Sequence, residues 1–600
     1  MLRRHCLALL MLPLMLAGAG LAPAADAQPS SIDAFFKDFT DAWVRRNPNL
    51  AISSAYFTGK EQDRLSRELT PLTRQRQLDN IRIARAGLEQ LGTFDPNAMT
   101  PAQRTSADVM RWQLQSIIDN EPYLDYDFPL QQFSGANVNL PNALVVTHPV
   151  KTPRDAENYI ARLKQVDDRM HEATATSRRQ AAAGILPPRF ILEATIRQMQ
   201  QFIEPEPAGN PLAAEFDRKL ADVSDLAPAR RAELTRQASE TVRREVYPAW
   251  KKAIATLQSQ LSKATDSAGL SRFANGAALY ALQLRRQNTT NLTPQEIHDI
   301  GLREVARIEG EMDALFRKLG YTEGTIAERV NRLSAELAYP NDDAGRKQIM
   351  EDIEGLLAKA LQRTTTSFDV RPKAAVIARP YPEFRWASAA ASYTGPPLDG
   401  SRPGIFQIPL RPGYMTKFGL PTLIFHETVP GHHFHIALVN ENTALPAFRR
   451  VSALGGFAAS VEGWALYAER FAAEDGWYEG DIAGLLGQLN GALFRARRLV
   501  VDTGLHALSW TRQQAIDFGI EASEVERYVV IPGQATSYMI GQLEIVKLRD
   551  RARAALGDRF SIREFHNVVL GAGIVPLSLL GTIVDQYIAR TLGATATPAA

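Results

Sequence analysis

The chain has 600 residues and a formal net charge of +2, with 68 lysine and arginine residues against 66 aspartate and glutamate residues. This near balance argues against a nucleic-acid partner, which would select a basic surface. The length exceeds the usual size of a single hydrophobic core. We therefore expect an N-terminal helical lobe over residues 28–290, a second lobe over 291–593, and a flexible tail over 594–600.

The first 27 residues have the pattern of a secretory signal peptide. Arg3 and Arg4 precede an apolar run over 6–21, and the small residues at 25–27 form a cleavage signal. The only cysteine, Cys6, lies inside this segment and is badly placed for lipid attachment. No later segment is long and apolar enough to span a bilayer. We expect a periplasmic or secreted protein without a membrane span, and the sequence leaves its oligomeric state open.

Most of the remaining chain has the periodicity of amphipathic helices, which predicts a mainly α fold. Thr293, Pro294 and Glu296 form an N-cap, a first-turn proline and a capping-box glutamate, so a helix should begin there and run to Gly320. A break is expected at 204–211, which is rich in proline. The other predicted helical stretches are 32–47, 74–91, 155–183 and 232–261.

One zone, 374–410, is rich in proline, glycine and aromatic residues and predicts a small β-sheet ending in the strand 404–410. Pro409 fits an exposed edge better than the centre of a sheet. Such an edge strand would line a cleft and pair with an extended substrate. The alternative is a structural hairpin that covers the core.

Histidine is concentrated in the segment His426-Glu-Thr-Val-Pro-Gly-His-His-Phe-His435, which holds four of the ten histidines of the chain. Imidazole and carboxylate are the ligands of catalytic zinc. A His-Glu pair on a helix begins the zincin motif, in which the glutamate is the base that activates water. We therefore predict a zinc site that includes His426, with Glu427 as the catalytic base.

The spacing departs from the usual His-Glu-x-x-His. On an unbroken helix His432 would point roughly 120° away from His426, and His433 would lie about 10 Å further along the axis. Proline removes a helical donor and glycine adopts unusual dihedrals at low cost. We therefore expect the helix to be interrupted or bulged at Pro430-Gly431, with either His432 or His433 as the second ligand.

A third ligand is expected from a buried helix about thirty residues downstream. Glu462 and Glu469, seven residues apart, fall on one face of this otherwise apolar segment. Carboxylates are costly to bury unless they are paired or bind a metal. Glu462 is the predicted third ligand. Glu469 could be a further ligand, or an outer partner that orients one of the histidines. The alternative is a carboxylate that faces solvent.

Three arginines, Arg495, Arg497 and Arg498, lie on a helix that is otherwise apolar. One of them could hold the C-terminal carboxylate of a peptide. The alternative is a solvated helix face. The sequence does not choose between carboxypeptidase, dipeptidase and endopeptidase action.

Together these motifs resemble the bacterial domain-of-unknown-function 885 family. The resemblance rests on the histidine segment, the helix 461–469, Asp399-Gly-Ser-Arg-Pro-Gly-Ile-Phe406 and Pro532-Gly-Gln-Ala-Thr-Ser-Tyr538, and extends upstream through 291–298. That family is similar to the gluzincin peptidases, such as thimet oligopeptidase and angiotensin-converting enzyme. The resemblance implies a large two-lobed helical zincin-like (gluzincin) fold with a small β-sheet edging the active-site cleft, and makes 291–593 the catalytic lobe.

The same resemblance implies residue roles. Thimet-type enzymes carry Gly-His-x-x-His after the His-Glu pair, which favours His432 as the second ligand. Tyr538 is similar to the tyrosines that stabilise the oxyanion in gluzincins. The implied function is a zinc metallopeptidase that cleaves peptides. Two alternatives remain: a degenerate peptide-binding protein without catalysis, and a metal-dependent hydrolase of a non-peptide ester or amide.

Overall fold

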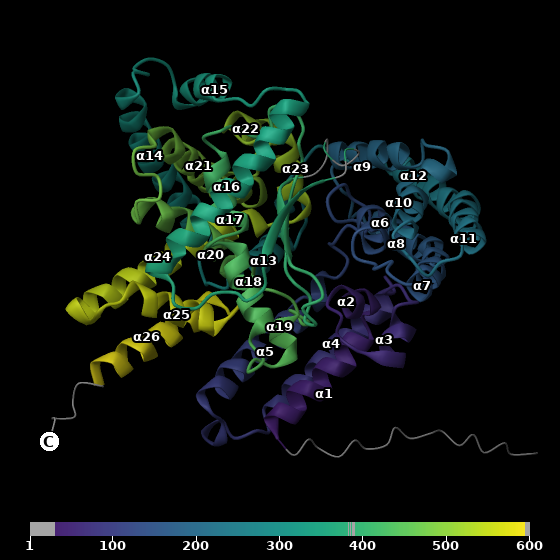
Figure 1. Cartoon of the computed structure of the whole chain (residues 1–600). Helices are drawn as coiled ribbons and strands as arrows, with labels where there is room; N and C mark the ends of the chain where they lie inside the picture. Colours follow the sequence, from purple (N-terminus) through teal and green to yellow (C-terminus); the bar gives the residue numbers. More distant parts are fainter. Residues whose placement is uncertain (1–30, 382, 384–385, 387–389, 594–600) are drawn as a thin grey trace, which may run out of the picture.

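The computed structural model describes residues 31–593 except 382, 384–385 and 387–389. The predicted signal peptide and the tail 594–600 lie outside the described residues. The described chain is mainly helical, as the sequence predicts, with one small sheet (Figure 1). The helices of the first half are α1 Ile32–Arg45, α2 Pro48–Ser53, α3 Gly59–Leu65, α4 Arg74–Leu91, α5 Pro101–Asp119, α6 Ala136–Val145, α7 Pro153–Leu163, α8 Val166–Ala182, α9 Arg189–Phe202, α10 Pro211–Leu220, α11 Pro228–Thr241, α12 Tyr247–Gln260 and α13 Gly276–Asn288.

The second half holds the sheet and the helices around it. Two of its long helices, α14 and α21, pack side by side. The elements are α14 Pro294–Lys318, α15 Ile326–Glu336, α16 Asp343–Ser367, β1 Val376–Pro380, β2 Ser392–Thr394, β3 Gly404–Ile408, α17 Leu420–Glu427, α18 His432–Glu441, α19 Ala447–Arg450, α20 Ala458–Glu474, α21 Ile482–His506, α22 Arg512–Asp517, α23 Ala522–Val530, α24 Ser537–Leu556, α25 Ile562–Ala572 and α26 Leu577–Gly593.

Local sequence signals explain several helix boundaries. The predicted capping box at Thr293 is present, with the Thr293 hydroxyl accepting from the backbone N–H of Glu296 and the Glu296 carboxylate accepting from that of Thr293. The predicted stretch 232–261 contains a π-helical turn, Val242–Val246, between α11 and α12. Pro248 lacks an N–H, so a regular helical hydrogen bond cannot form there. The stretch 155–183 is likewise divided into α7 and α8.

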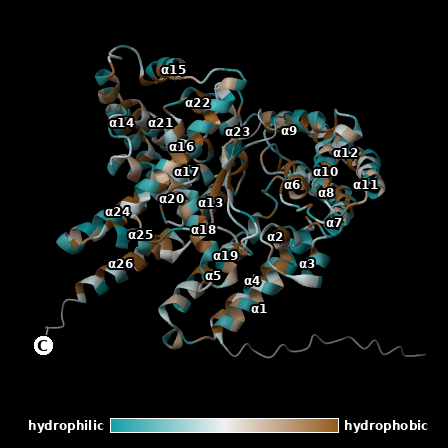
Figure 2. Ribbon diagram, viewed as in Figure 1, coloured by the Kyte–Doolittle hydropathy of each residue, from teal (hydrophilic) through white to brown (hydrophobic). Residues whose placement is uncertain are grey.

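The buried apolar residues form separate clusters. One cluster lies entirely within residues 69–264 and holds α6 to α12 together. The largest cluster joins α1, α4 and α5 to residues 270–587, and Phe36 of α1 contacts Phe448 of α19. Figure 1 shows α6 to α12 grouped on one side of the molecule, and Figure 2 shows that the outer helices carry both polar and apolar faces. The division into two lobes at residue 290 stays a prediction. Helices α1, α4 and α5 precede this residue in the chain, yet they share a hydrophobic core with the second half.

The sheet has the strand order β1-β3-β2. β3 pairs in parallel with β1 and antiparallel with β2, so it is the central strand of the described sheet. The expectation that this strand forms an exposed edge is therefore wrong. Pro409 follows Ile408, the last residue of the ladder, so its missing N–H costs no strand hydrogen bond. Phe406 and Ile408 of β3 are fully buried.

Candidate metal site

The histidine segment is split between two helices, as the sequence predicts. α17 ends at Glu427 and α18 begins at His432, and Thr428 between them has φ −117° and ψ −95°. Thr428 still belongs to the end of α17, because its backbone N–H and its hydroxyl both donate to the carbonyl of Ile424, at 2.9 and 2.6 Å. The predicted interruption at Pro430-Gly431 is confirmed.

Glycine at position 431 allows the chain to fold back against the end of α17. A Cβ atom at this position would lie 1.9 Å from the carbonyl oxygen of His426 and 2.4 Å from that of Phe425. The connection is held from the other side by Trp464 of α20, whose indole Nε1 donates to the carbonyl of Pro430 at 2.9 Å. The start of α18 is therefore fixed by contacts with two other helices.

Replacing Gly431 with alanine is expected to displace α18 from α17, because the added Cβ overlaps two backbone oxygens that cannot rotate away. The expected loss is about 2 kcal/mol or more of unfolding free energy. Urea denaturation followed by circular dichroism measures this loss. Gly456→Ala is the matched control, since a Cβ there meets nothing within 4 Å. Equal stability of the two variants would contradict the close approach at Gly431.

The break brings His426, His432 and Glu462 together. Their ligand atoms lie within 4.8 Å of one another, and no other such group of three histidine, cysteine or acidic residues occurs among the described residues. Oε2 of Glu462 is 3.6 Å from Nε2 of His426 and 3.3 Å from Nε2 of His432. This oxygen is buried, yet it forms no hydrogen bond with either ring. The three groups converge on a common point instead of pairing with each other.

Glu469 lies behind this cluster, about two turns further along the same face of α20. Its Oε1 is 2.6 Å from Nδ1 of His426, and its Oε2 accepts a hydrogen bond from the Thr422 hydroxyl at 2.9 Å. It is 1% exposed, so the alternative of a solvent-facing carboxylate does not apply. The contact to Nδ1 leaves Nε2 of His426 directed toward Glu462 and His432.

The carboxylates of Glu462 and Glu469 stabilise positive charge at the cluster. Burial alone would lower the pKa of His426, but the neighbouring carboxylates of Glu462 and Glu469 raise it to about 9. Burial opposes ionisation of Glu462, yet His432 and His426 hold the pKa of its carboxyl well below its usual range. The same charges that favour a proton on the imidazole also favour a bound cation.

His433, the rival to His432, points away from the cluster. Its Nδ1 lies 2.9 Å from the hydroxyl of Tyr393 on β2, and the two rings meet edge to face. Burial lowers the pKa of His433 to about 4. His433 therefore links α18 to the sheet, while His432 faces Glu462.

Tyr538 lies beside the cluster, and Glu427 adjoins it in the chain. Glu427 is the last residue of α17, directly after His426, and is 8% exposed. The ring of Tyr538, on α24, lies parallel to that of His426 with centroids 6.3 Å apart. α24 approaches α20 closely, because Gly463 and Gly541 face each other and a Cβ on Gly463 would lie 2.5 Å from the Cα of Gly541. This contact packs the helix that carries Tyr538 against the helix that carries Glu462.

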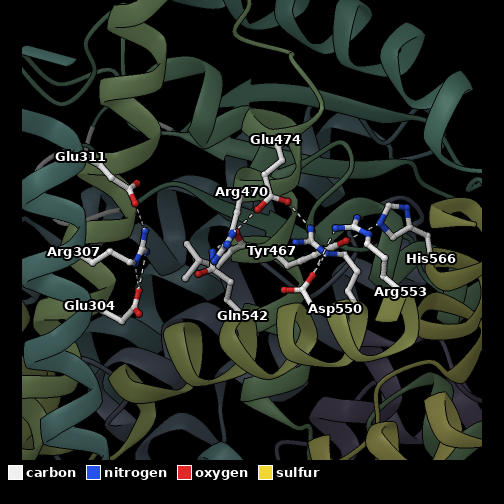
Figure 3. A network of polar contacts seen from close by, with 12 residues as sticks. Glu304, Arg307, Glu311, Tyr467, Arg470, Glu474, Gln542, Asp550, Arg553 and His566 are labelled. Atoms are coloured by element: carbon white, nitrogen blue, oxygen red, sulfur yellow. Dashed lines mark hydrogen bonds and ion pairs between the residues drawn. The ribbon is translucent and has the colours of Figure 1, made fainter. Parts of the chain in front are cut away.

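Other residues of α20 belong to a polar network (Figure 3). Tyr467 pairs with His566 at 2.9 Å, and Gln542 donates to the carbonyl of Leu466 at 2.8 Å. Glu474 accepts from Arg470 and forms an ion pair with Arg549. These contacts tie α20 to α24 and α25, which restrains the helix that carries both glutamates.

The sequence did not single out Thr422, Trp464 or the partners of Arg498. Thr422 lies one turn before His426 on α17, and that spacing is the only signal that could have indicated it. Arg498 is not on a solvated face, as one sequence interpretation allowed. It is 5% exposed, donates to Glu524, and lies 4.6 Å over the ring of Tyr538.

The fold and the site define a class: a mainly helical protein in which two histidines and a glutamate from three helices converge beside a further glutamate. The profile of the family described as "Bacterial protein of unknown function (DUF885)" matches residues 53–584. The chain belongs to this family, which confirms the resemblance found in its motifs.

Two solved structures are similar to this chain. The first is the crystal structure of a "putative lipoprotein" from Colwellia psychrerythraea, with 31% identity, a TM-score of 0.88, and coverage of 94% of this chain and 100% of that one. The second is a "putative lipoprotein of unknown function" from Shewanella oneidensis, with 19% identity, a TM-score of 0.67, and coverage of 93% and 100%. The second shows likeness of fold alone. No curated protein matches the chain.

Across the part of the chain that the structure describes, no helix is both long and apolar enough to cross a membrane. This agrees with the sequence prediction that no later segment spans a bilayer.

Proposed function

We propose that the protein is a zinc-dependent metallopeptidase. The observation that carries the proposal is the convergence of His426, His432 and Glu462 on one point without hydrogen bonds to each other. Two neutral imidazoles and one carboxylate are a donor set of catalytic zinc sites, which keep a further position open. Glu427 adjoins this set in sequence, as a base for water should.

The distances fit such an ion. Zinc bound tetrahedrally at about 2.0–2.2 Å from nitrogen and oxygen donors places neighbouring donors roughly 3.3–3.6 Å apart. The separations of Glu462 Oε2 from the two Nε2 atoms, 3.3 and 3.6 Å, lie in this range. Glu469 supplies the outer carboxylate that commonly orients a ligating histidine.

In this proposal His426, His432 and Glu462 hold the zinc, which supplies a Lewis acid for the peptide carbonyl and lowers the pKa of water. Glu427 takes the proton from the attacking water and passes it to the leaving amine. Tyr538 donates a hydrogen bond from its hydroxyl to the oxygen that becomes negative in the transition state. Arg498, stacked over the ring, and Gln534, 3.5 Å from the hydroxyl, restrain the tyrosine.

The wider setting follows from the same resemblance. We propose a two-lobed, gluzincin-like fold in which the small sheet borders the site, because Tyr393 of β2 reaches His433 next to the second ligand. We also propose a location in the cell envelope or outside the cell. The signal-like segment at the N-terminus and the naming of both similar structures as lipoproteins support this location.

The metal content of two neighbouring variants tests the site. Mass spectrometry of protein purified without added metal or chelator should find about one zinc per chain in the wild type and in His433→Ala, and almost none in His432→Ala. The reason is that only His432 faces Glu462. His433→Ala is a matched control, since both histidines are buried at the start of α18.

Loss of zinc in His433→Ala but not in His432→Ala would show that the donor set is wrong. A wild-type chain that takes up no zinc would favour a degenerate peptide-binding protein. A zinc-loaded chain that cleaves esters or non-peptide amides but no peptide would favour the other alternative hydrolase.

A further inference from the structure

The three arginines of α21 differ in their partners. Arg497 donates to Glu309 at 2.9 Å, and Arg498 donates to Glu524 at 2.8 Å. Arg495 has no carboxylate within hydrogen-bond distance among the described residues. Its nearest one, Oε1 of Glu469, is 3.8 Å from Nη2. Arg495 is therefore the member of the group whose charge is least neutralised.

Arg495 also has donors without partners among the described residues, whereas in Arg498 the only buried nitrogen without one is Nη1. Nη1 donates to the carbonyl of Gly491 at 3.2 Å, and Nε is buried without a hydrogen-bond partner in the described chain. A guanidinium has five N–H donors in a fixed planar fork. The remaining donors of Arg495 are available to a second group, and its side chain is 17% exposed.

The position of Arg495 places it beside the metal cluster. Its Cζ lies 5.9 Å from the centre of the Tyr538 ring, and that ring is stacked on His426. Glu469 separates the guanidinium from the metal-ligating histidine by contacts of 3.8 and 2.6 Å. The charge of Arg495 thus lies beside Tyr538 and is separated from His426 by one side chain.

A purely structural role for Arg495, as the counter-ion of Glu469, does not account for the long distance between the two groups. Glu469 already accepts the Thr422 hydroxyl and contacts His426, so each of its oxygens has a partner. At 3.8 Å the Arg495 contact is too long for a hydrogen bond. A half-buried guanidinium whose only role was to pair with Glu469 should form the short bidentate contact that arginine and carboxylate prefer.

We propose that Arg495 binds the C-terminal carboxylate of the peptide, so that the enzyme removes one or two residues from the C-terminus. This rests on the metallopeptidase function proposed above. An extended chain advances about 3.3–3.6 Å per residue. A carboxylate one or two residues beyond the cleaved bond can therefore reach a group that, like Arg495, is separated from the cluster by one side chain. An internal peptide segment would leave the guanidinium without a partner.

Three peptides test the proposal: acetyl-Ala-Ala-Ala-Phe with a free carboxylate, its C-terminal amide, and acetyl-Ala-Ala-Ala-Glu amide, which keeps a carboxylate only on a side chain. Chromatography and mass spectrometry of the products give kcat/KM and the cleaved bond. The zinc-loaded wild type should prefer the free acid over both amides by roughly 10- to 100-fold, the effect of one charge-assisted hydrogen bond. Arg495→Gln should remove this preference, and Arg497→Gln should retain it.

Binding gives a second readout that does not depend on turnover. In a Glu427→Gln background, calorimetry with the free-acid peptide should show an affinity roughly 10- to 100-fold weaker when Arg495→Gln is added. Zinc content and thermal unfolding of each variant establish that the site and the fold are intact. Arg495→Lys, which keeps the charge, should recover part of the preference.

Several results would overturn the proposal. The wild type could cleave the two phenylalanine peptides equally, or the glutamate amide as fast as the free acid, which would assign the arginine to a side-chain carboxylate. Arg495→Gln could lose zinc and slow all peptides alike, which is the result expected of a counter-ion for Glu469. Each of these results leaves the proposed peptidase function in place. A zinc-loaded wild type that cleaves none of the three peptides would reject both the peptidase function and the role of Arg495.

Discussion

Glu427→Gln is expected to lower peptide hydrolysis by about 10²- to 10⁴-fold while leaving zinc content near that of the wild type. The amide cannot accept a proton from water, but Glu427 is not among the three groups that converge at the site. Steady-state assays with the free-acid peptide, together with mass spectrometry for zinc, measure both quantities on the same preparation.

The matched control for this variant is Glu354→Gln on α16, an exposed position outside the site. It should behave as the wild type in both measurements. Near-normal activity of Glu427→Gln would mean that another group is the base, whatever the metal content. A loss of zinc in this variant would mean that Glu427 holds the ion.

Glu462→Gln is expected to lose zinc and activity together. Glutamine removes the one carboxylate of the described chain that lies against both Nε2 atoms, at 3.3 and 3.6 Å. The zinc affinity should fall by at least roughly 100-fold, more than for an outer partner of a ligand. Titration with zinc in competition with a chelator gives the affinity of each variant.

Glu469→Gln provides the graded comparison, since it makes the same chemical change seven residues along α20. Its carboxylate contacts Nδ1 of His426 and not the converging nitrogen. Zinc affinity should fall by about 10- to 100-fold in this variant. If Glu462→Gln bound zinc as tightly as Glu469→Gln, Glu462 would have no direct role as a ligand.

The sequence predicts some features well because they depend on local chemistry. The helix break follows from proline and glycine at 430 and 431, and the start of α14 follows from the capping box at Thr293. Both depend on backbone geometry within a few residues. The family follows from motifs spread over most of the chain.

Other features depend on contacts between distant segments, which a single sequence does not contain. The choice between His432 and His433 requires the direction in which α18 leaves the break, and that direction is set by the contact of Gly431 with His426 and by Trp464. The central position of β3 depends on its pairing with β1 and β2 on either side. Pro409 misled the prediction because strand ends cannot be placed to within one residue from composition.

The arginines of α21 show the same limit. Their spacing gives no indication that Arg498 pairs with Glu524 and Arg497 with Glu309, while Arg495 has no such partner. The ion-pair partners decide which of the three arginines keeps donors for a ligand. These partners are known only from the packing of α21 against α14 and α23.

Because the site is divided among α17, α18 and α20, binding of the proposed metal ion would be linked to the stability of the folded molecule. In an unbroken helix two ligands keep their spacing even when the rest of the protein loosens, because helical rise alone sets it. Here three helices must be docked before the donors meet. A metal ion bound there would stabilise the folded state by about 4 kcal/mol when the free ion is at 1,000 times its Kd, and would thereby raise the melting temperature. Chelation would then lower the temperature at which the helices separate, and heating would release the ion in the same cooperative step.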